Sequence, residues 1–199
     1  MTLDTLLALA GFAFVTSITP GPNNLMLMAS GANYGLRRTV PHMLGVGLGF
    51  GAMIVCVGLG LAGLFAAVPW AKPALAAVSV VYLLWLAWRI ATAAPPEPGA
   101  AAAGRPLTFA QAAAFQWVNP KAWTMALTAL SLYATGAVWS VVAVAAVFTV
   151  VNIPSVGSWT LLGQSMARWL TSPARLRAFN WTMAALLVAS LWPSVAPLL

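Results

Sequence analysis

The stretch SITPGPNNLML, residues 17–27, interrupts an apolar run where a membrane helix would cross the centre of a bilayer. Pro20 and Pro22 lack the backbone N–H and clash with the preceding turn, so a continuous helix is not expected here. Gly21, Asn23 and Asn24 complete the interruption. A break frees backbone N–H and C=O groups, which only protein or a watery cavity can satisfy inside a membrane. The stretch therefore predicts a site, with a simple kink for packing as the alternative.

The composition is that of an integral membrane protein. Of 199 residues, 62% are hydrophobic and 6% are charged, and the mean hydropathy is +0.92. Soluble domains carry about 25% charged residues. The net charge of +7 does not indicate nucleic acid, because the basic residues are scattered at helix ends rather than clustered with aromatic residues. Asp4 lies near the start without a basic region before it, so we expect the first apolar segment to be a retained helix.

Six windows are apolar over about the 20 residues that a membrane-spanning helix needs. They cover residues 3–33, 39–68, 70–92, 107–133, 137–163 and 175–196. Between the third and fourth lies a linker rich in Pro, Ala and Gly, residues 93–106, with no core of its own. We expect a single all-α transporter domain made of repeat one (1–92), this linker and repeat two (107–199).

The two halves are related by a shift of one hundred residues. Pro20 then falls on Pro120, and the first helix of each half is interrupted, by TPGPNN and by NPKAW. Because three helices is an odd number, the second half must enter the membrane from the opposite side. Inverted repeats with paired broken helices are typical of transporters whose site lies at the repeat interface near the midplane. The sequence thus predicts six transmembrane helices as two inverted three-helix repeats, with helices 1 and 4 broken near mid-membrane.

The basic residues predict the orientation. Lys72 falls on one face of the predicted bundle and Lys121 falls inside the membrane, whereas seven arginines share the other face: Arg37, Arg38, Arg89, Arg105, Arg168, Arg175 and Arg177. Positive charge marks the cytoplasmic side. We therefore expect the linker in the cytoplasm and both termini outside it, in the periplasm of a bacterium.

Several motifs resemble a known family. PGPNNLMLMASGANYGLRRTVPHMLGVGLG (residues 20–49), VYLLWLAWR, WVNPKAW and RLRAFN occur in the order and spacing of the lysine exporter and homoserine/threonine exporter (LysE/RhtB) superfamily. The resemblance implies a six-helix protein of the bacterial inner membrane that exports amino acids or close derivatives. Val80 and Ala87 stand where that family usually has glycines, a departure that concerns helix packing and leaves the main inference intact.

The helix breaks supply the first candidate substrate-binding residues. A helix starting near Asn23 or Asn24 would point its positive end inward, which suits a carboxylate. Lys121 is the one charge far from both membrane faces, where insertion costs roughly 2.5–3.5 kcal/mol, so we expect it to contact substrate or the carbonyls freed by TPGPNN. Its alternative role is a lysine that snorkels to an interface. Asn119, just before Pro120, is a candidate whose alternative is a helix N-cap.

Other candidates come from the remaining segments. Asn152 and Pro154 interrupt the fifth segment, and Asn152 lines the cavity or makes an interhelical hydrogen bond. Tyr82 either turns its hydroxyl into the cavity or packs in the core. Gln116, one helical turn before Pro120, is a minor candidate. The only histidine, His42, lies near an interface, where we expect a hydrogen-bonded bystander.

Other functions fit the sequence less well. An enzyme would need clustered ligands or a catalytic motif, and the chain has one His, one Cys and two acids. A metal-cation transporter would need carboxylates or sulfur ligands in the helices. A channel or membrane scaffold remains the main alternative to a transporter. We therefore expect an alternating-access exporter of amino acids or related metabolites without cofactor or metal, and a homodimer is compatible with it. Energy coupling would involve Asp4, His42 or the membrane potential.

Overall fold

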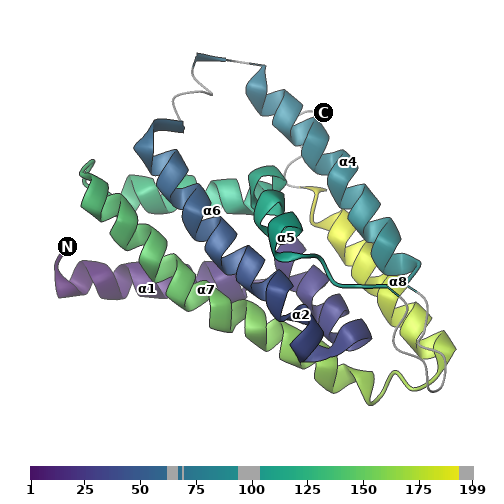
Figure 1. Cartoon of the computed structure of the whole chain (residues 1–199). Coiled ribbons are helices and arrows are strands. Elements are labelled where there is room, and N and C mark those ends of the chain that lie inside the picture. Colours follow the sequence, from purple (N-terminus) through teal and green to yellow (C-terminus); the bar gives the residue numbers. More distant parts are fainter. Residues whose placement is uncertain (62–66, 69, 94–103, 193–199) are drawn as a thin grey trace.

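The computed structural model describes residues 1–61, 67–68, 70–93 and 104–192 (Figure 1). Within these ranges every regular element is helical, as the composition predicts. Most of the predicted linker, residues 93–106, lies outside the described residues. The elements are α1 (Leu3–Ile18), α2 (Pro22–Cys56), the π-helical turn η1 (Val57–Leu61), α4 (Ala71–Ala91), α5 (Phe109–Phe115), the 3₁₀ turn η2 (Gln116–Val118), α6 (Pro120–Tyr133), α7 (Val138–Ala167) and α8 (Pro173–Ala189).

The first apolar segment is broken where the sequence predicts. α1 ends at Ile18, Thr19 is extended (φ −64°, ψ 144°), and α2 begins at Pro22. A proline suits the first position of a helix, because its fixed φ is helical and its missing N–H would have no partner there. Two separate helices therefore replace the single kinked helix that was the alternative.

The second half is broken in the same manner. α5 and η2 run to Val118, and Asn119 is extended (φ −91°, ψ 109°). Pro120 then starts α6, again as the first helical residue. Both predicted helix breaks are confirmed, and each is followed at once by a helix that begins with proline.

Gly35 divides α2 into two arms. Its backbone has φ 77° and ψ 167°, a conformation that side chains larger than glycine rarely adopt. Residues 22–34 form the short arm and residues 36–56 the long arm. The division falls between the first two apolar windows, so the short arm completes the first predicted segment and the long arm belongs to the second.

The predicted interruption of the fifth segment at Pro154 is wrong. α7 runs without a break from Val138 to Ala167 with Pro154 inside it. A single proline removes one helical hydrogen bond, and helices packed in protein tolerate that loss. Ser155 donates from its hydroxyl to the carbonyl of Val151 over 2.8 Å, one of several hydroxyl bonds to the backbone along this helix.

Among the described residues, three helical stretches are long and apolar enough to cross a membrane. They are Pro22–Leu61, Pro73–Ala91 and Val138–Ala167, and α1 is a shorter apolar helix. The chain is therefore a helical membrane protein with several apolar helices.

The long arm of α2 and α7 pack antiparallel at glycines. In the contacting pairs one residue number rises by four as the other falls by four: Met43 with Gly157, Gly47 with Ile153, and Gly51 with Thr149. Small residues at every fourth position let membrane helices approach closely. The glycines in residues 45–51 therefore serve close helix packing.

The short arm of α2 crosses α7 at two further glycines. A methyl group at Gly31 would collide with the backbone of Thr160, and one at Gly163 would collide with the backbone of Met28. The two backbones are therefore in direct contact at the crossing, beside the short arm's first turns.

Two other helix pairs run parallel. α1 and α7 share contacts whose numbers rise together: Phe12 with Phe148, Ser17 with Asn152, and Ile18 with Trp159. The long arm of α2 and α5 do the same: Gly45 with Phe109, and Gly49 with Ala113. α4 and α8 lie side by side at the edge of the molecule (Figure 1). This bundle brings residues of both helix breaks to one cavity.

The crossing at Gly163 gives a test of the packing. We expect Gly163→Ala to lower the free energy of unfolding by about 1–3 kcal/mol, because the new methyl group meets backbone atoms that cannot rotate away. The measurement is the thermal unfolding midpoint in detergent. Gly11→Ala is the matched control, since nothing lies within 4 Å of a methyl group there. Equal midpoints for both variants would contradict the close crossing.

Candidate functional site

The break after α1 leaves backbone carbonyls without helical partners, and side chains from other elements satisfy them. Asn24 donates from Nδ2 to the carbonyls of Ser17 and Thr19, over 2.8 and 2.7 Å. Trp159 donates from its indole N–H to the carbonyl of Ile18 over 3.0 Å. An unsatisfied carbonyl inside a membrane costs several kcal/mol, so these donors are a condition for the break.

Lys121 is the third donor, and it connects the two breaks. Its Nζ donates to the carbonyl of Thr19 over 2.7 Å, to the hydroxyl of the same residue over 3.0 Å, and to the carbonyl of Pro20 over 3.4 Å. The ammonium therefore lies at the negative end of α1, where a positive charge is stabilised. The expected contact with carbonyls freed by TPGPNN is confirmed.

The two helices that follow the breaks start differently. Asn119 accepts from the backbone N–H of Lys121 over 3.1 Å and so is the N-cap of α6, the alternative role considered for it. Gly21 offers α2 no side-chain cap. The stem of Lys121 lies on Gly21, where a methyl group would come within 2.7 Å of Cδ. A methyl group at Gly21 would thus displace the lysine side chain from the position it has at the start of α2.

Five of the six predicted binding residues line one cavity between the breaks. Its empty space, including the part open to solvent, is about 330 Å³. The predicted residues in its wall are Asn23, Asn24, Asn119, Lys121 and Asn152, together with Gly21. Ser17, Thr16 and Gln116 add further polar groups.

Amide groups also line this cavity. Asn23 and Gln116 form a reciprocal pair, with Nδ2 to Oε1 at 2.9 Å and Nε2 to Oδ1 at 3.3 Å. Asn152 is buried and donates from Nδ2 to the hydroxyl of Ser17 over 3.1 Å. Its Oδ1 has no hydrogen-bond partner among the described residues. The cavity thus contains a buried amide oxygen that is free to accept a hydrogen bond.

Tyr82 lies away from this cavity. Its ring packs on Trp85 and Phe115, with centroids 5.4 and 5.6 Å apart. It is not among the residues that line the space between the breaks. The packing alternative describes its position in this structure.

Sequence reasoning did not select two hydroxyl residues of the wall, Thr16 and Ser17. Single hydroxyls are common in apolar helices, where they bond to the preceding turn, as Thr16 does to the carbonyl of Phe12 over 2.7 Å. Their position immediately before TPGPNN is the one signal that could have identified them.

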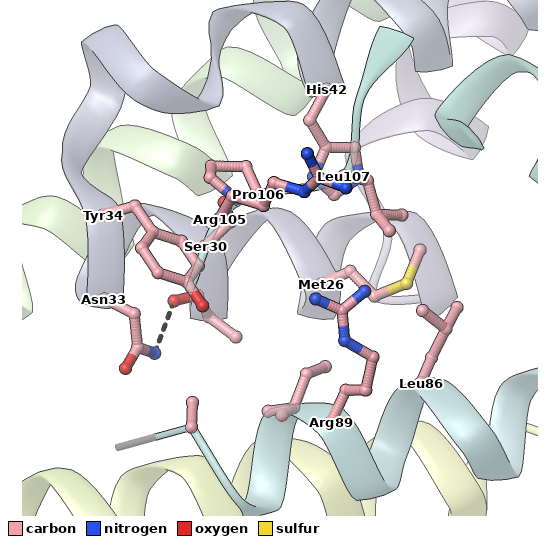
Figure 2. A pocket seen from close by; sticks show the side chains of 13 residues that line it. Met26, Ser30, Asn33, Tyr34, His42, Leu86, Arg89, Arg105, Pro106 and Leu107 are labelled. Carbon is pink, nitrogen blue, oxygen red and sulfur yellow. Dashed lines mark hydrogen bonds between the residues drawn. The ribbon is translucent and has the colours of Figure 1, made fainter. Parts of the chain in front are cut away.

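His42 differs from its expected role as a hydrogen-bonded bystander. It is buried, with 1% of its surface exposed, and neither ring nitrogen has a hydrogen-bond partner among the described residues. His42 lies at the start of the long arm of α2. The short arm and residues 105–107 line the same pocket (Figure 2).

The chain is similar in sequence to known translocators. Residues 14–190 match the family model of the LysE type translocator. The chain is 32% identical over 192 residues to proteins named cysteine/O-acetylserine efflux protein from Escherichia coli strains HS and K12 and from Shigella sonnei. Each match covers 94% of this chain and 96% of the relative. No solved structure matches the chain.

The carbonyl contacts of Asn24 give a stability test. Asn24→Ala removes the side-chain donor to the Ser17 carbonyl, and we expect it to lower the free energy of unfolding by about 2 kcal/mol. Asn23→Ala is the control: its partner Gln116 keeps a bond to the Ala112 carbonyl, so the loss should be smaller. Thermal unfolding in detergent measures both. A loss for Asn23→Ala as large as that for Asn24→Ala would contradict this account of the break.

Proposed function

The chain belongs to the family of LysE type translocators, and from this premise we propose that the cavity between the helix breaks holds the substrate during alternating access. The chain is a transporter rather than an enzyme, and it exports amino acids or closely related small metabolites. One observation carries the proposal. Lys121 and the start of α2, which has no side-chain cap, lie at the same cavity, and amide groups line other parts of its wall.

The polarity of the cavity suits a zwitterion. A substrate carboxylate beside Lys121 would meet the ammonium and the positive end of α2 together. The substrate ammonium would donate to the unpaired Oδ1 of Asn152, which lies in the same wall. The amide groups of Asn23, Asn24 and Asn119 would also surround the substrate. Because these groups are uncharged, Lys121 alone would select for a carboxylate.

We propose that the substrate is cysteine, O-acetylserine or an amino acid of similar size. The relatives named above carry these two compounds in their names and match over almost the whole chain. Both compounds are small zwitterions with a short side chain, which suits a cavity wall that combines one lysine with several amide groups.

The six-span inverted repeat is part of the same proposal. In such a repeat α1 corresponds to α5, and the long arm of α2 corresponds to α7. The parallel contact of α1 with α7 then has its counterpart in the parallel contact of α5 with the long arm of α2. The antiparallel contact between the long arm and α7 joins equivalent helices of the two repeats, as does the contact between α4 and α8. Sites between such repeats lie near the midplane and are opened in turn to each side.

The protein is a multi-pass protein of the bacterial inner membrane, and we propose that both termini lie in the periplasm. The arginines at residues 37–38, 89, 105, 168, 175 and 177 occupy the ends of segments on one side of this arrangement. Their charge favours the cytoplasm for that side.

Lys121→Met tests the substrate role of the lysine. The methionine keeps length and apolar bulk, so we expect normal insertion and loss of most transport, because no other cation in the cavity wall can pair with a carboxylate. Lys121→Arg should recover transport only in part, since the guanidinium is larger and planar. The measurement is counterflow of labelled O-acetylserine in proteoliposomes, normalised to folded protein.

Arg177→Met is the matched control, because this cation is exposed at the start of α8 and lies outside the cavity wall. It should transport like the unmodified protein. Full activity of Lys121→Met would contradict the role of the lysine, whereas current without saturation in the unmodified protein would indicate a channel.

The orientation has its own test. With both termini outside, a reporter fused to the C-terminus should be active only if it is one that functions in the periplasm. A reporter inserted between residues 98 and 99 should be active only if it functions in the cytoplasm. A cytoplasmic C-terminus would contradict both the orientation and the inverted repeat.

A further inference from the structure

A second cavity lies at the opposite end of the short arm of α2. Figure 2 shows it between that arm, the last turns of α4 and residues 105–107. Its empty space is about 480 Å³, larger than that of the cavity at Lys121. Met26, Leu86 and Leu107 give it an apolar wall.

Two arginines face this space from opposite walls. Arg89 rises from α4 and Arg105 comes from the segment before α5, as Figure 2 shows. Among the described residues, no acidic side chain lines the cavity. Two guanidinium groups at one cavity suit a carboxylate ligand. The two carboxylate oxygens can accept the two parallel N–H bonds that a guanidinium group donates.

The arginine-bearing walls are held in place by neighbouring side chains. The guanidinium of Arg89 lies over the ring of Trp85, 5.1 Å from its centroid. Arg38 donates to the carbonyl of Gly104 over 2.9 Å and also lies 5.4 Å from the ring centroid of Tyr34. The segment that carries Arg105 is therefore fastened to the start of the long arm of α2.

His42 supplies an independent sign of a ligand. It lines this cavity, it is 1% exposed, and both ring nitrogens lack hydrogen-bond partners among the described residues. Buried polar groups without partners are rare in folded proteins, because each one loses its hydration without replacement. A polar ligand in the cavity would provide the missing partner.

We infer that this second cavity is a loading site, where a small carboxylate-bearing substrate binds through Arg89 and Arg105 before it reaches Lys121. The inference rests on the proposed function and adds a second substrate-binding site to it. The apolar wall would receive the short substrate side chain, and His42 would hydrogen-bond to its polar groups. The two arginines belong to the arginine-rich face proposed as cytoplasmic, the side from which an exporter takes its substrate.

The two cavities share structural elements but are separated. The short arm of α2 contributes Asn24 to the cavity at Lys121 and Tyr34 to the loading site. Met26 lines the loading site, Val156 lines the other cavity, and both belong to one buried apolar cluster with Phe115. The substrate would therefore pass this cluster when the transporter changes conformation, and each cavity can be tested alone.

The first experiment measures binding to the purified protein in detergent by isothermal titration, with O-acetyl-L-serine and with acetate as probes. Acetate carries the carboxylate without an ammonium group, and acetamide is its neutral control. In the Lys121→Met background, which removes the other proposed carboxylate site, Arg89→Gln combined with Arg105→Gln should weaken acetate binding about tenfold, and Arg89→Lys alone should have an intermediate effect. Lys121→Met should retain acetate binding at the loading site, and acetamide should not bind.

The second experiment measures transport of O-acetyl-L-serine from the arginine-rich face in inside-out vesicles. The double arginine variant should raise KM from this face about tenfold. Arg177→Gln removes a charge from the same face outside the cavity and should leave KM unchanged, which separates binding from general attraction.

The outcomes distinguish the two proposals. Acetate binding and KM that are unaffected by the double arginine variant would overturn the loading site, as would an equal rise of KM in Arg177→Gln. Acetate binding that depends on the arginines, in a protein that does not transport O-acetyl-L-serine, would support the carboxylate site and refute the proposed substrate.

Discussion

The carbonyl groups at the end of α1 impose the constraint on which the rest of the structure depends. In the proposed six-span arrangement the break lies inside the membrane, where no water satisfies these groups, so donors must come from the protein itself. Asn24, Trp159 and Lys121 supply those donors from α2, α7 and α6. One local interruption therefore ties four helices together at the point where the cavity forms.

The glycines make this arrangement sterically feasible. Gly21 lets the stem of Lys121 pass over the start of α2, and Gly31 and Gly163 bring the short arm of α2 into backbone contact with α7. Trp159, the residue before Thr160 at this contact, donates to the carbonyl of Ile18. Close helix packing and the polar contacts at the break are thus two parts of one structural solution.

Residues with local, chemically distinctive effects could be predicted from the sequence. Proline ends or starts helices by its own geometry, so the breaks at Pro20 and Pro120 were predictable. Lys121 could be singled out because it is the one charge predicted to lie far from both membrane faces. Burial of His42 could not be predicted, because residues distant in sequence cover it.

The same limit explains the errors elsewhere. Whether Pro154 breaks α7 or stays inside it depends on packing against α1 and α2, and the place of Tyr82 depends on Phe115 from the other half of the chain. Ser17 has no sequence signal of its own, since its contact with Asn152 joins residues 135 positions apart. These features arise from tertiary contacts that no local pattern encodes.

Lys121 joins the stability of the break to the proposed transport cycle. Its ammonium now bonds to neutral carbonyl oxygens of Thr19 and Pro20. A carboxylate is the stronger acceptor, because a charge-assisted hydrogen bond exceeds one to a neutral oxygen. A substrate that takes the ammonium would therefore leave the Pro20 carbonyl without this donor and weaken the hold of α6 on the end of α1. Substrate binding and loosening of the contact between the two breaks would then be one event, which gives the two halves a physical reason to move when the cavity fills.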